Sequence, residues 1–260
     1  MTAPANRDRF ATLTRIMARL RGPRGCPWDK KQTHLSLRES FMEECYETLE
    51  AIDENDPTKL KEELGDLLLH IVFQSRIAAE AGEFDIKDVI EGITTKLVRR
   101  HPHIFSGVKV KDAEEVALNW EELKKEEKNG SSPILDGVPG ELPALAQAQS
   151  LQRRAAGVGF DWPDVEGVLD KIYEETRELA EAGDSAQRTM EMGDLLFSIV
   201  NLSRRLDISA EAALREANRR FKTRFTRMEE ICLKRGVRLA DLPLKEQDRI
   251  WDKAKKDTQG

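Results

Sequence analysis

Apolar positions recur along most of the chain with the spacing of helices rather than strands. In the stretch Glu62–Phe73, "EELGDLLLHIVF", the residues Leu64, Leu68 and Ile71 fall on one helical stripe. The same arrangement returns 128 residues later as "MEMGDLLFSIVN". Each copy contains a glycine in the helix interior, which costs roughly 1 kcal/mol relative to alanine. The pattern predicts two amphipathic helices that share an unusual requirement for that glycine.

The similarity between the two halves extends beyond these helices. The matching pairs are "EECYETLEA" (43–51) with "EETRELAEA" (174–182), "KLVRR" (96–100) with "RFKTR" (220–224), and "WEELK" (120–124) with "WDKAK" (251–255). Between the copies, "NGSSPILDGVPGELPAL" is rich in Gly, Pro and Ser, as is typical of a linker. We therefore predict two similar domains, residues 1–128 and 146–260, joined by a linker at 129–145.

Helix-ending signals divide each copy in the same way. The segments 54–57 ("ENDP") and 182–185 ("AGDS") separate a first helix from the "GDLL" helix. Asp85 and Ser209 are suited to be N-caps of a third helix, which in the first copy ends near Pro102. We expect an all-α fold with about three to five helices per copy. Their wide apolar faces predict packing of the four-helix-bundle type on dimerisation.

Composition narrows the class of protein. Charged residues make up 35% of the 260 residues and aromatic residues only 6%, which favours a soluble helical protein. No apolar run has the length of a membrane span, and no signal-peptide core is present. The three cysteines are widely spaced, so they predict neither a disulfide framework nor a zinc site and suit a reducing cytoplasm. The net charge of −6 gives no general attraction to nucleic acid, and we expect no direct binding to it.

Acidic residues three positions apart lie on the repeated helices and on the helices before them. Residues with this spacing share a helix face, and a short turn makes the two helices antiparallel, so four carboxylates can converge. The two sets are Glu44, Glu47, Glu63 and Asp66 in the first copy, and Glu175, Glu178, Glu191 and Asp194 in the second. A single such pair is ordinary on a solvated helix face, but the doubled pattern beside Gly65 and Gly193 favours a metal site. Oxygen ligands without Cys or His indicate Mg²⁺, Mn²⁺ or Ca²⁺.

Basic and aromatic residues accompany the second set of acids. Lys171 lies one turn before Glu175, Arg220 and Arg224 are one turn apart, and Trp251 and Lys255 repeat that spacing. Cations for phosphate oxygens and an indole for a base together suggest a nucleotide site. The alternatives are solvated helix edges for the basic pairs and a packing anchor for each tryptophan, the role we favour for Trp120.

With these residues in view, the chain resembles the MazG-type nucleoside triphosphate pyrophosphohydrolases over nearly its whole length. The stretches "GCPWDKKQTH", "RRHPHIF" and "VGFDWPDVEGVLDKIYEE" carry the likeness alongside the doubled acid pairs. The resemblance implies an all-α, Mg²⁺-dependent homodimer that converts nucleoside triphosphates to monophosphate and pyrophosphate. It also implies a role in nucleotide-pool cleaning or stress responses, with a catalytic C-terminal domain and a mainly structural N-terminal one.

The resemblance assigns roles to residues of the second copy. Glu175, Glu178, Glu191 and Asp194 would bind the metal, and Lys171, Arg220, Arg224, Trp251 and Lys255 would contact the nucleotide. Two positions depart from the family pattern: Arg220 replaces a lysine, which changes the geometry of the contact, and Gln187 replaces another, with Arg188 as the substitute.

The first copy keeps its four acids and has Lys59, Lys96 and Arg100 nearby in sequence. It has Ser40 where the second copy has Lys171. We therefore expect it to be able to bind metal but to be weakly active or inactive. His70, which Ser198 replaces in the second copy, is expected to be a core histidine with its hydrogen bonds satisfied.

The expected reaction is attack of water on the triphosphate chain, with cleavage between the α and β phosphates. Either Glu175 or Glu178 can serve as the general base, while Lys171, Arg220 and Arg224 would offset the charge of the leaving oxygen. A di-iron oxidase is a rival, but it needs Glu-x-x-His pairs, which the acid motifs lack. The other alternative is a helical interaction module that binds nucleotide without turnover.

Overall fold

The chain forms two compact units, Met1–Gly130 and Ser131–Gly260. The computed structural model describes residues 6, 8–113, 115–116, 119–120, 123 and 133–258. Within these residues all regular structure is helical, with no strand, so the predicted all-α class is confirmed. No helix among them has both the length and the apolar character that crossing a bilayer requires.

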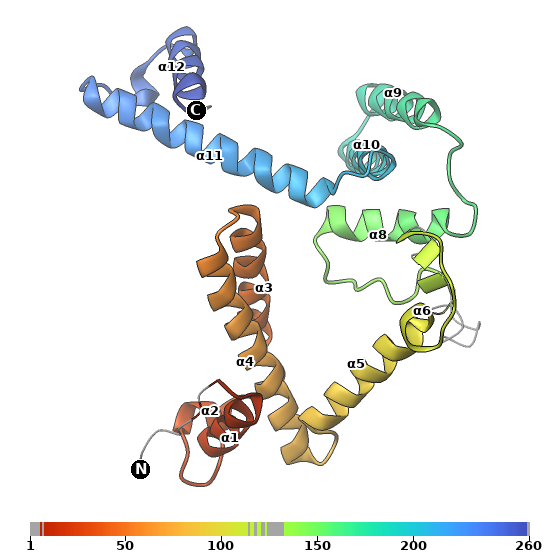
Figure 1. Cartoon of the computed structure of the whole chain (residues 1–260). Coiled ribbons are helices and arrows are strands. Elements are labelled where there is room, and N and C mark those ends of the chain that lie inside the picture. Colours follow the sequence, from red (N-terminus) through yellow and green to blue (C-terminus); the bar gives the residue numbers. More distant parts are fainter. Residues whose placement is uncertain are drawn as a thin grey trace. The chain divides into compact units, whose positions relative to one another are not determined.

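The first unit is built on a helical hairpin (Figure 1). Its helices are α3 (Arg38–Asp53) and α4 (Pro57–Ala81), which pack along each other. The side chain of Asp56 caps α4 by accepting hydrogen bonds from the backbone N–H groups of Thr58 and Lys59. Helix α1 (Phe10–Leu20) packs on α4, and the short α2 (Pro27–Lys31) lies between α1 and α3 in sequence. The predicted break at 54–57 is therefore where the hairpin turns.

Helix α5 (Ile86–Arg100) follows the hairpin and begins with a capping box. Asp85 accepts hydrogen bonds from the backbone N–H groups of Lys87 and Asp88, and the Asp88 carboxylate accepts one from Asp85 N–H. The helix ends at Arg100, before α6 (Pro102–Phe105). The predicted N-cap and the predicted end near Pro102 are both confirmed.

The second unit repeats this order of elements. Its helices are α8 (Ala144–Ala156), α9 (Val165–Glu181), α10 (Ser185–Arg205), α11 (Ala210–Lys234) and α12 (Leu244–Asp257), with a 3₁₀ turn at Leu239–Asp241. Helices α9 and α10 form the hairpin, and the predicted N-cap Ser209 begins α11. Arg154 of α8 donates hydrogen bonds to the carbonyls of Ile134, Asp136 and Gly137, so part of the predicted linker is held by this unit.

Each unit ties a loop to its hairpin with an arginine whose side chain is largely buried. In the first unit, Arg21 donates to the carbonyls of Asp29 and Gln32 and forms an ion pair with Glu80, 2.8 Å away. In the second unit, Arg204 pairs with Asp161 at 2.5 Å. Because these pairs join a loop to a long helix, they hold the loops that carry "GCPWD" and "GFDW" against the hairpins.

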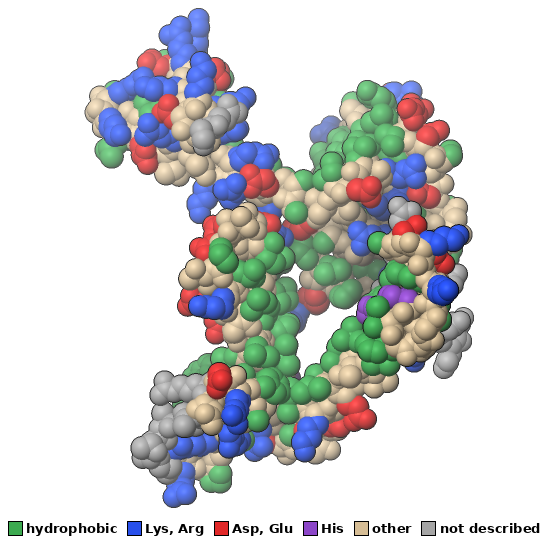
Figure 2. Space-filling model, viewed as in Figure 1, with side chains coloured by type: hydrophobic (Ala, Val, Ile, Leu, Met, Phe, Trp, Pro, Cys, Tyr) green, Lys and Arg blue, Asp and Glu red, His purple; other side chains and the backbone are tan. Residues whose placement is uncertain are grey.

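The buried cores are small for a chain of this length. One cluster consists of Met17, Leu37, Val72 and Phe73, and the other of Met228, Ile231, Cys232, Ile250 and Ala254. Many large apolar side chains stay exposed, and Figure 2 shows such a surface over α4 and α5 of the first unit. None of the residues of α5 is buried, although Ile93 and Leu97 lie on its apolar stripe. These faces are typical of helices that pack against another protein surface.

Candidate metal and nucleotide site

The hairpin of the second unit brings carboxylates together. Oxygen atoms of Glu175 and Glu178 on α9 and of Glu191 on α10 all lie within 4.8 Å of one another. Glu175 and Glu191 are buried, with 3% and 7% of their surfaces exposed, and Glu178 is half-buried. The i,i+3 spacing and the antiparallel hairpin therefore bring together three of the four acids that the sequence predicts to converge.

The charges of this cluster oppose one another. Burial raises the pKa of Glu191, and the charges of Glu178, Glu175 and Asp194 raise it further. Asp194, one turn from Glu191 on α10, thus adds its charge to the cluster. A divalent cation would remove this repulsion, and four carboxylates are a donor set that suits a hard cation. The residues present therefore fit a metal site.

Lys171 already neutralises part of the cluster. Its Nζ lies 2.6 Å from Oε1 of Glu175 and 3.2 Å from Glu174. Hydrogen bonds to these two carboxylates raise the pKa of Lys171, so the ammonium stays charged at neutral pH. The side chain is 34% exposed, which leaves part of it open to solvent beside the acids. The predicted proximity of Lys171 to Glu175 is confirmed.

The hairpin of the first unit forms a similar cluster without a lysine of this kind. Oxygen atoms of Glu44, Glu63 and Asp66 lie within 4.8 Å of one another. Burial raises the pKa of Glu44 and that of Glu63, and Glu47 adds its charge to both. At the position of Lys171 the first unit has Ser40, whose hydroxyl donates to the carbonyl of Leu37.

Two other residues of the first unit, Lys59 and His70, have distinct surroundings. Lys59 pairs with Glu50 at 2.6 Å and with Glu54 at 3.3 Å, and its charge also acts on Glu63 of the cluster. His70 is buried, as predicted, but its Nδ1 has no hydrogen-bond partner among the described residues. The prediction of a satisfied core histidine is therefore wrong. Phe41 contacts the ring edge-on, and an aromatic ring offers Nδ1 no acceptor.

The remaining residues predicted for the nucleotide lie on other parts of the second unit. Helix α12 packs chiefly on α11, whereas α9 packs chiefly on α10. Arg220 and Arg224 are ten to fourteen residues into α11, roughly 15–20 Å along it from the end that meets α8. Arg220 pairs with Glu216 at 3.1 Å. Lys171 thus pairs with an acid of the cluster, whereas Arg220 pairs with an acid of its own helix.

Trp251, Lys255 and Arg188 have distinct surroundings. Trp251 is half-buried and packs on Phe221, 5.4 Å away between ring centroids, and on the core of α11 and α12. Lys255 is exposed on the same helix. Arg188 donates to the carbonyl of Ala182 and so spans the turn between α9 and α10. In the first unit, the guanidinium of Arg100 lies 5.4 Å from the ring centroid of Trp120, whereas Lys124 lies outside the described residues.

The interior glycines of the hairpins face open space. A Cβ atom added at Gly65 or Gly193 would meet no described atom of the chain within 4 Å, apart from the helix's own nearby backbone. A helix position without a Cβ leaves room for a close neighbour or a substrate. Within one chain no such neighbour is present among the described residues, so any close approach must come from a ligand or from a second molecule.

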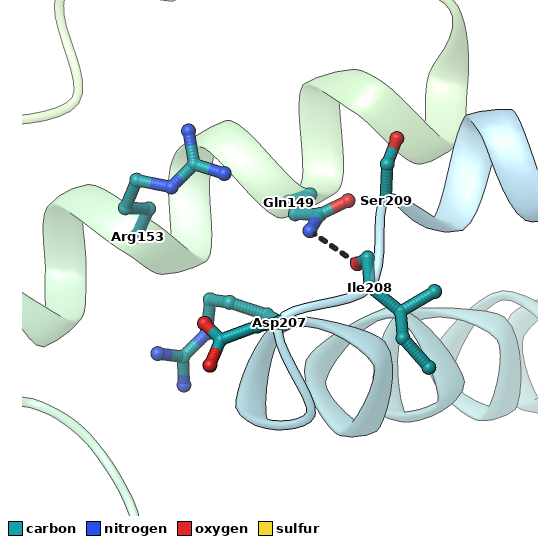
Figure 3. A pocket seen from close by; sticks show the side chains of 6 residues that line it. Gln149, Arg153, Asp207, Ile208 and Ser209 are labelled. Atoms are coloured by element: carbon teal, nitrogen blue, oxygen red, sulfur yellow. Dashed lines mark hydrogen bonds between the residues drawn. The ribbon is translucent and has the colours of Figure 1, made fainter.

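A pocket of about 410 Å³ lies where α8 meets the loop between α10 and α11 (Figure 3). Gln149 donates to the carbonyl of Ile208 and accepts from the N–H of Ala210, so it fixes the start of α11. Asp207 lines the same pocket and has a positive φ of 56°, which non-glycine residues seldom adopt. The sequence prediction missed this site, because a glutamine on a helix gives no signal of a distant backbone contact.

Comparisons with known proteins agree with these features. A family model described as the MazG nucleotide pyrophosphohydrolase domain matches residues 32–105, within the first unit. The MazG nucleoside triphosphate pyrophosphohydrolase/pyrophosphatase of Thermotoga maritima is 49% identical over 250 residues, covering 95% of each chain. The nucleoside triphosphate pyrophosphohydrolase of Escherichia coli K12 is 43% identical over 257 residues, covering 96% of this chain and 97% of the relative.

A third relative contains a similar stretch within a longer protein. The Bacillus subtilis protein YabN is 49% identical over 251 residues, which make up 95% of this chain but 51% of YabN. The helical fold and the acid clusters agree with the two relatives that match over nearly their full length. The chain belongs to the MazG nucleotide pyrophosphohydrolase family of enzymes.

Proposed function

We propose that the chain hydrolyses nucleoside triphosphates and their deoxy forms to the monophosphate and pyrophosphate, with Mg²⁺ as the cation and Mn²⁺ as a substitute. The observation that carries the proposal is the buried cluster of Glu175, Glu178 and Glu191, with Lys171 bound to its edge. The names of the Thermotoga and Escherichia relatives give the reaction of those proteins. Membership of this enzyme family favours turnover over the alternative of a non-catalytic nucleotide-binding module.

Glu175, Glu178, Glu191 and Asp194 would hold the cation. When bound, it supplies positive charge that neutralises the triphosphate chain and makes its phosphorus atoms more electrophilic. Of the two candidates for the general base we favour Glu178, because Lys171 occupies an oxygen of Glu175 at 2.6 Å. Glu178 would take the proton of the attacking water, and Lys171 would stabilise charge on the phosphate oxygens.

We further propose that the protein works as a homodimer in which a second copy completes each site. The supporting observation is that α11, which carries Arg220 and Arg224, packs mainly on α12 rather than on the hairpin of the acids. Residues 210–258 carry fourteen Lys and Arg against nine Asp and Glu, although the whole chain has a net charge of −6. This basic segment, with Arg224, Trp251 and Lys255, is complementary in charge to the acid cluster of another copy.

Exposed apolar surface supports the same dimer. On α10, the helix that carries Glu191 and Asp194, the side chains Met192, Leu196 and Ile199 are more than 40% exposed. Packing of these faces would form the expected four-helix bundle around the site. The three cysteines are free thiols, which suits the cytoplasmic location we propose. A role in nucleotide-pool cleaning or in a stress response follows from the proposed reaction.

The experiment that tests the reaction is product analysis with a panel of NTPs and dNTPs and Mg²⁺. We expect monophosphate and pyrophosphate in equal amounts, resolved by ³¹P NMR, and no product after chelation of the metal. Diphosphate and orthophosphate would contradict the proposed bond cleavage. Nucleotide binding without any product across the panel would contradict hydrolysis itself.

A further inference from the structure

The pocket at the start of α11 has no part in the proposed reaction. Its volume of about 410 Å³ lies within the range of roughly 300–1,000 Å³ that is typical of small-molecule sites. The residues that line it come from three elements: Gln149 and Arg153 of α8, Arg204 of α10, and Asp207, Ile208 and Ser209 of the loop before α11. The pocket therefore lies where α11 joins the rest of the second unit.

Two guanidinium groups line this pocket and have unused donors. Arg153 forms no hydrogen bond or ion pair with any residue that the structure describes. Arg204 donates from Nε and Nη2 to Asn201 and Asp161, whereas its Nη1 has no acceptor among the described residues. The side chain of Arg204 is only 13% exposed, so these bonds hold it in place. Charged donors without acceptors favour an anionic ligand, and the planar guanidinium group suits phosphate oxygens.

The pocket also contains an acceptor, the carboxylate of Asp207, on the loop that faces the helix of Arg153 (Figure 3). Asp207 has a φ of 56°, whereas the turn that follows α4 in the first unit has Gly82 at a φ of 73°. Because glycine adopts this conformation without steric cost, the backbone does not require an aspartate here. The carboxylate would repel a bare phosphate ion, but it can accept a hydrogen bond from a hydroxyl group. A phosphate ester of a sugar carries both groups.

We propose that this pocket binds a phosphate monoester that carries a sugar hydroxyl, such as a nucleoside monophosphate, without a divalent cation. Arg153, Nη1 of Arg204 and the Ser209 hydroxyl donate to the phosphate oxygens. Asp207 accepts a hydrogen bond from the sugar. Because Gln149 already binds the loop and the first turn of α11, a ligand in the pocket holds this junction more firmly. The inference does not depend on the proposed reaction, although a nucleoside monophosphate is one of its products.

Titration calorimetry of the full chain in EDTA tests the site, because without a divalent cation the acid clusters repel anions. The probes are AMP, ribose 5-phosphate and inorganic phosphate. We expect one AMP per chain and an affinity at least about tenfold weaker in Arg153→Gln, since a bidentate phosphate contact is lost. Arg177→Gln, which changes an exposed arginine of α9 outside the pocket, should bind AMP as the unmodified protein does. Tighter binding of AMP than of ribose 5-phosphate would identify a nucleotide as the ligand, and equal binding a sugar phosphate.

Asp207→Asn tests the acceptor, because asparagine also adopts a positive φ and should keep the turn. Loss of the charge should strengthen the binding of inorganic phosphate, whereas AMP also loses a charge-assisted hydrogen bond. The preference for AMP over inorganic phosphate should therefore fall about fivefold. A preference that stays unchanged in Asp207→Asn would overturn the role of this carboxylate.

Hydrogen–deuterium exchange locates the bound ligand. We expect AMP in EDTA to slow exchange of the backbone amides in residues 206–213. Protection confined to other segments, an unchanged affinity in Arg153→Gln, or no binding of AMP and ribose 5-phosphate at millimolar concentrations would each overturn the inference. None of these results bears on the proposed hydrolysis, which is measured with Mg²⁺.

Discussion

The two hairpins of this chain carry the same pattern of acids, but different members of it cluster and different side chains accompany them. In α9 and α10 the cluster of Glu175, Glu178 and Glu191 carries the ammonium of Lys171. In α3 and α4 the cluster of Glu44, Glu63 and Asp66 has Ser40 at that position, and the buried imidazole of His70 follows Asp66 by one turn of α4. The difference shows that convergent carboxylates define where a cation can bind, whereas the neighbouring side chains decide what the site can do with it.

The largest expected difference between the units is in turnover. Glu178→Ala removes both a proposed cation ligand and the favoured base, so we expect pyrophosphate release to fall by at least about a thousandfold. Glu47→Ala makes the matching change in the first unit and should leave the rate within about twofold. Initial rates with saturating nucleotide and Mg²⁺ give the comparison. If Glu47→Ala lowered the rate more than Glu178→Ala, the active site would lie in the first unit, where the family model matches.

Exchange of the companion residue tests the role of Lys171. Lys171→Ser gives the second unit the residue of the first, and we expect kcat/KM to fall about a hundredfold because a preorganised positive charge is lost. Ser40→Lys is the reciprocal variant and should leave the rate unchanged, since the first unit is proposed to contribute little turnover. If Lys171→Ser instead keeps a rate close to that of the unmodified protein, the lysine pairs with Glu175 but does not contribute to catalysis.

The free energy of unfolding tests whether the two arginine ion pairs, Arg21–Glu80 and Arg204–Asp161, stabilise their units equally. Asp161→Asn removes the partner of Arg204, and Glu80→Gln that of Arg21, so each should lower the free energy of unfolding by about 2 kcal/mol. Hydrogen bonds from Arg21 lower the pKa of Glu80. Its contribution is therefore present above the ordinary pKa of 4.5 and disappears as the pH falls through the lowered value.

Urea titrations at neutral pH and at progressively more acid pH measure both effects. Glu80→Gln should resemble the unmodified protein more closely as the pH falls through the lowered pKa of Glu80, because protonation removes the charge that Arg21 pairs with. Equal destabilisation at the two pH values would mean that the loss comes from packing rather than from the charge.

Substitution of the interior glycines, Gly65 and Gly193, is expected to change stability and activity least. Gly65→Ala and Gly193→Ala should each stabilise the helix of an isolated chain by up to about 1 kcal/mol, because the added Cβ meets no described atom. If a second copy or a nucleotide approaches Gly193, the alanine should raise KM or weaken the dimer despite the better helix. Calorimetry measures the stability of the helix, and sedimentation measures the affinity of the dimer. A stabilised Gly193→Ala variant with unchanged KM and dimer affinity would exclude a close neighbour at this glycine.

The sequence allowed much of the local structure to be predicted. Side-chain caps such as Asp85 and Ser209 act within a few residues of themselves, so they mark helix starts reliably. The convergence of Glu175 with Glu191 also follows from local rules, because a three-residue spacing and a short turn leave few alternatives.

Long-range contacts were beyond such reasoning. The pairs Arg21–Glu80 and Asp161–Arg204 span 59 and 43 residues, and no spacing rule connects their members. The missing partner of His70 depends on Phe41, a residue of the facing helix. Spacing placed Arg220 and Arg224 on one face of α11 but gave no indication of how far that face lies from the acids of the same chain.

The proposal that one site is shared by two chains has a direct test in mixed dimers. Glu178→Ala inactivates the acid side of a site and Arg224→Ala its basic side, and each variant alone should be nearly inactive. Equal mixing with subunit exchange makes half of the dimers hybrid, each with one complete site, so we predict recovery to about a quarter of the unmodified rate. A mixture that forms hybrids, verified by mass spectrometry, but stays as inactive as its parents would contradict the shared site.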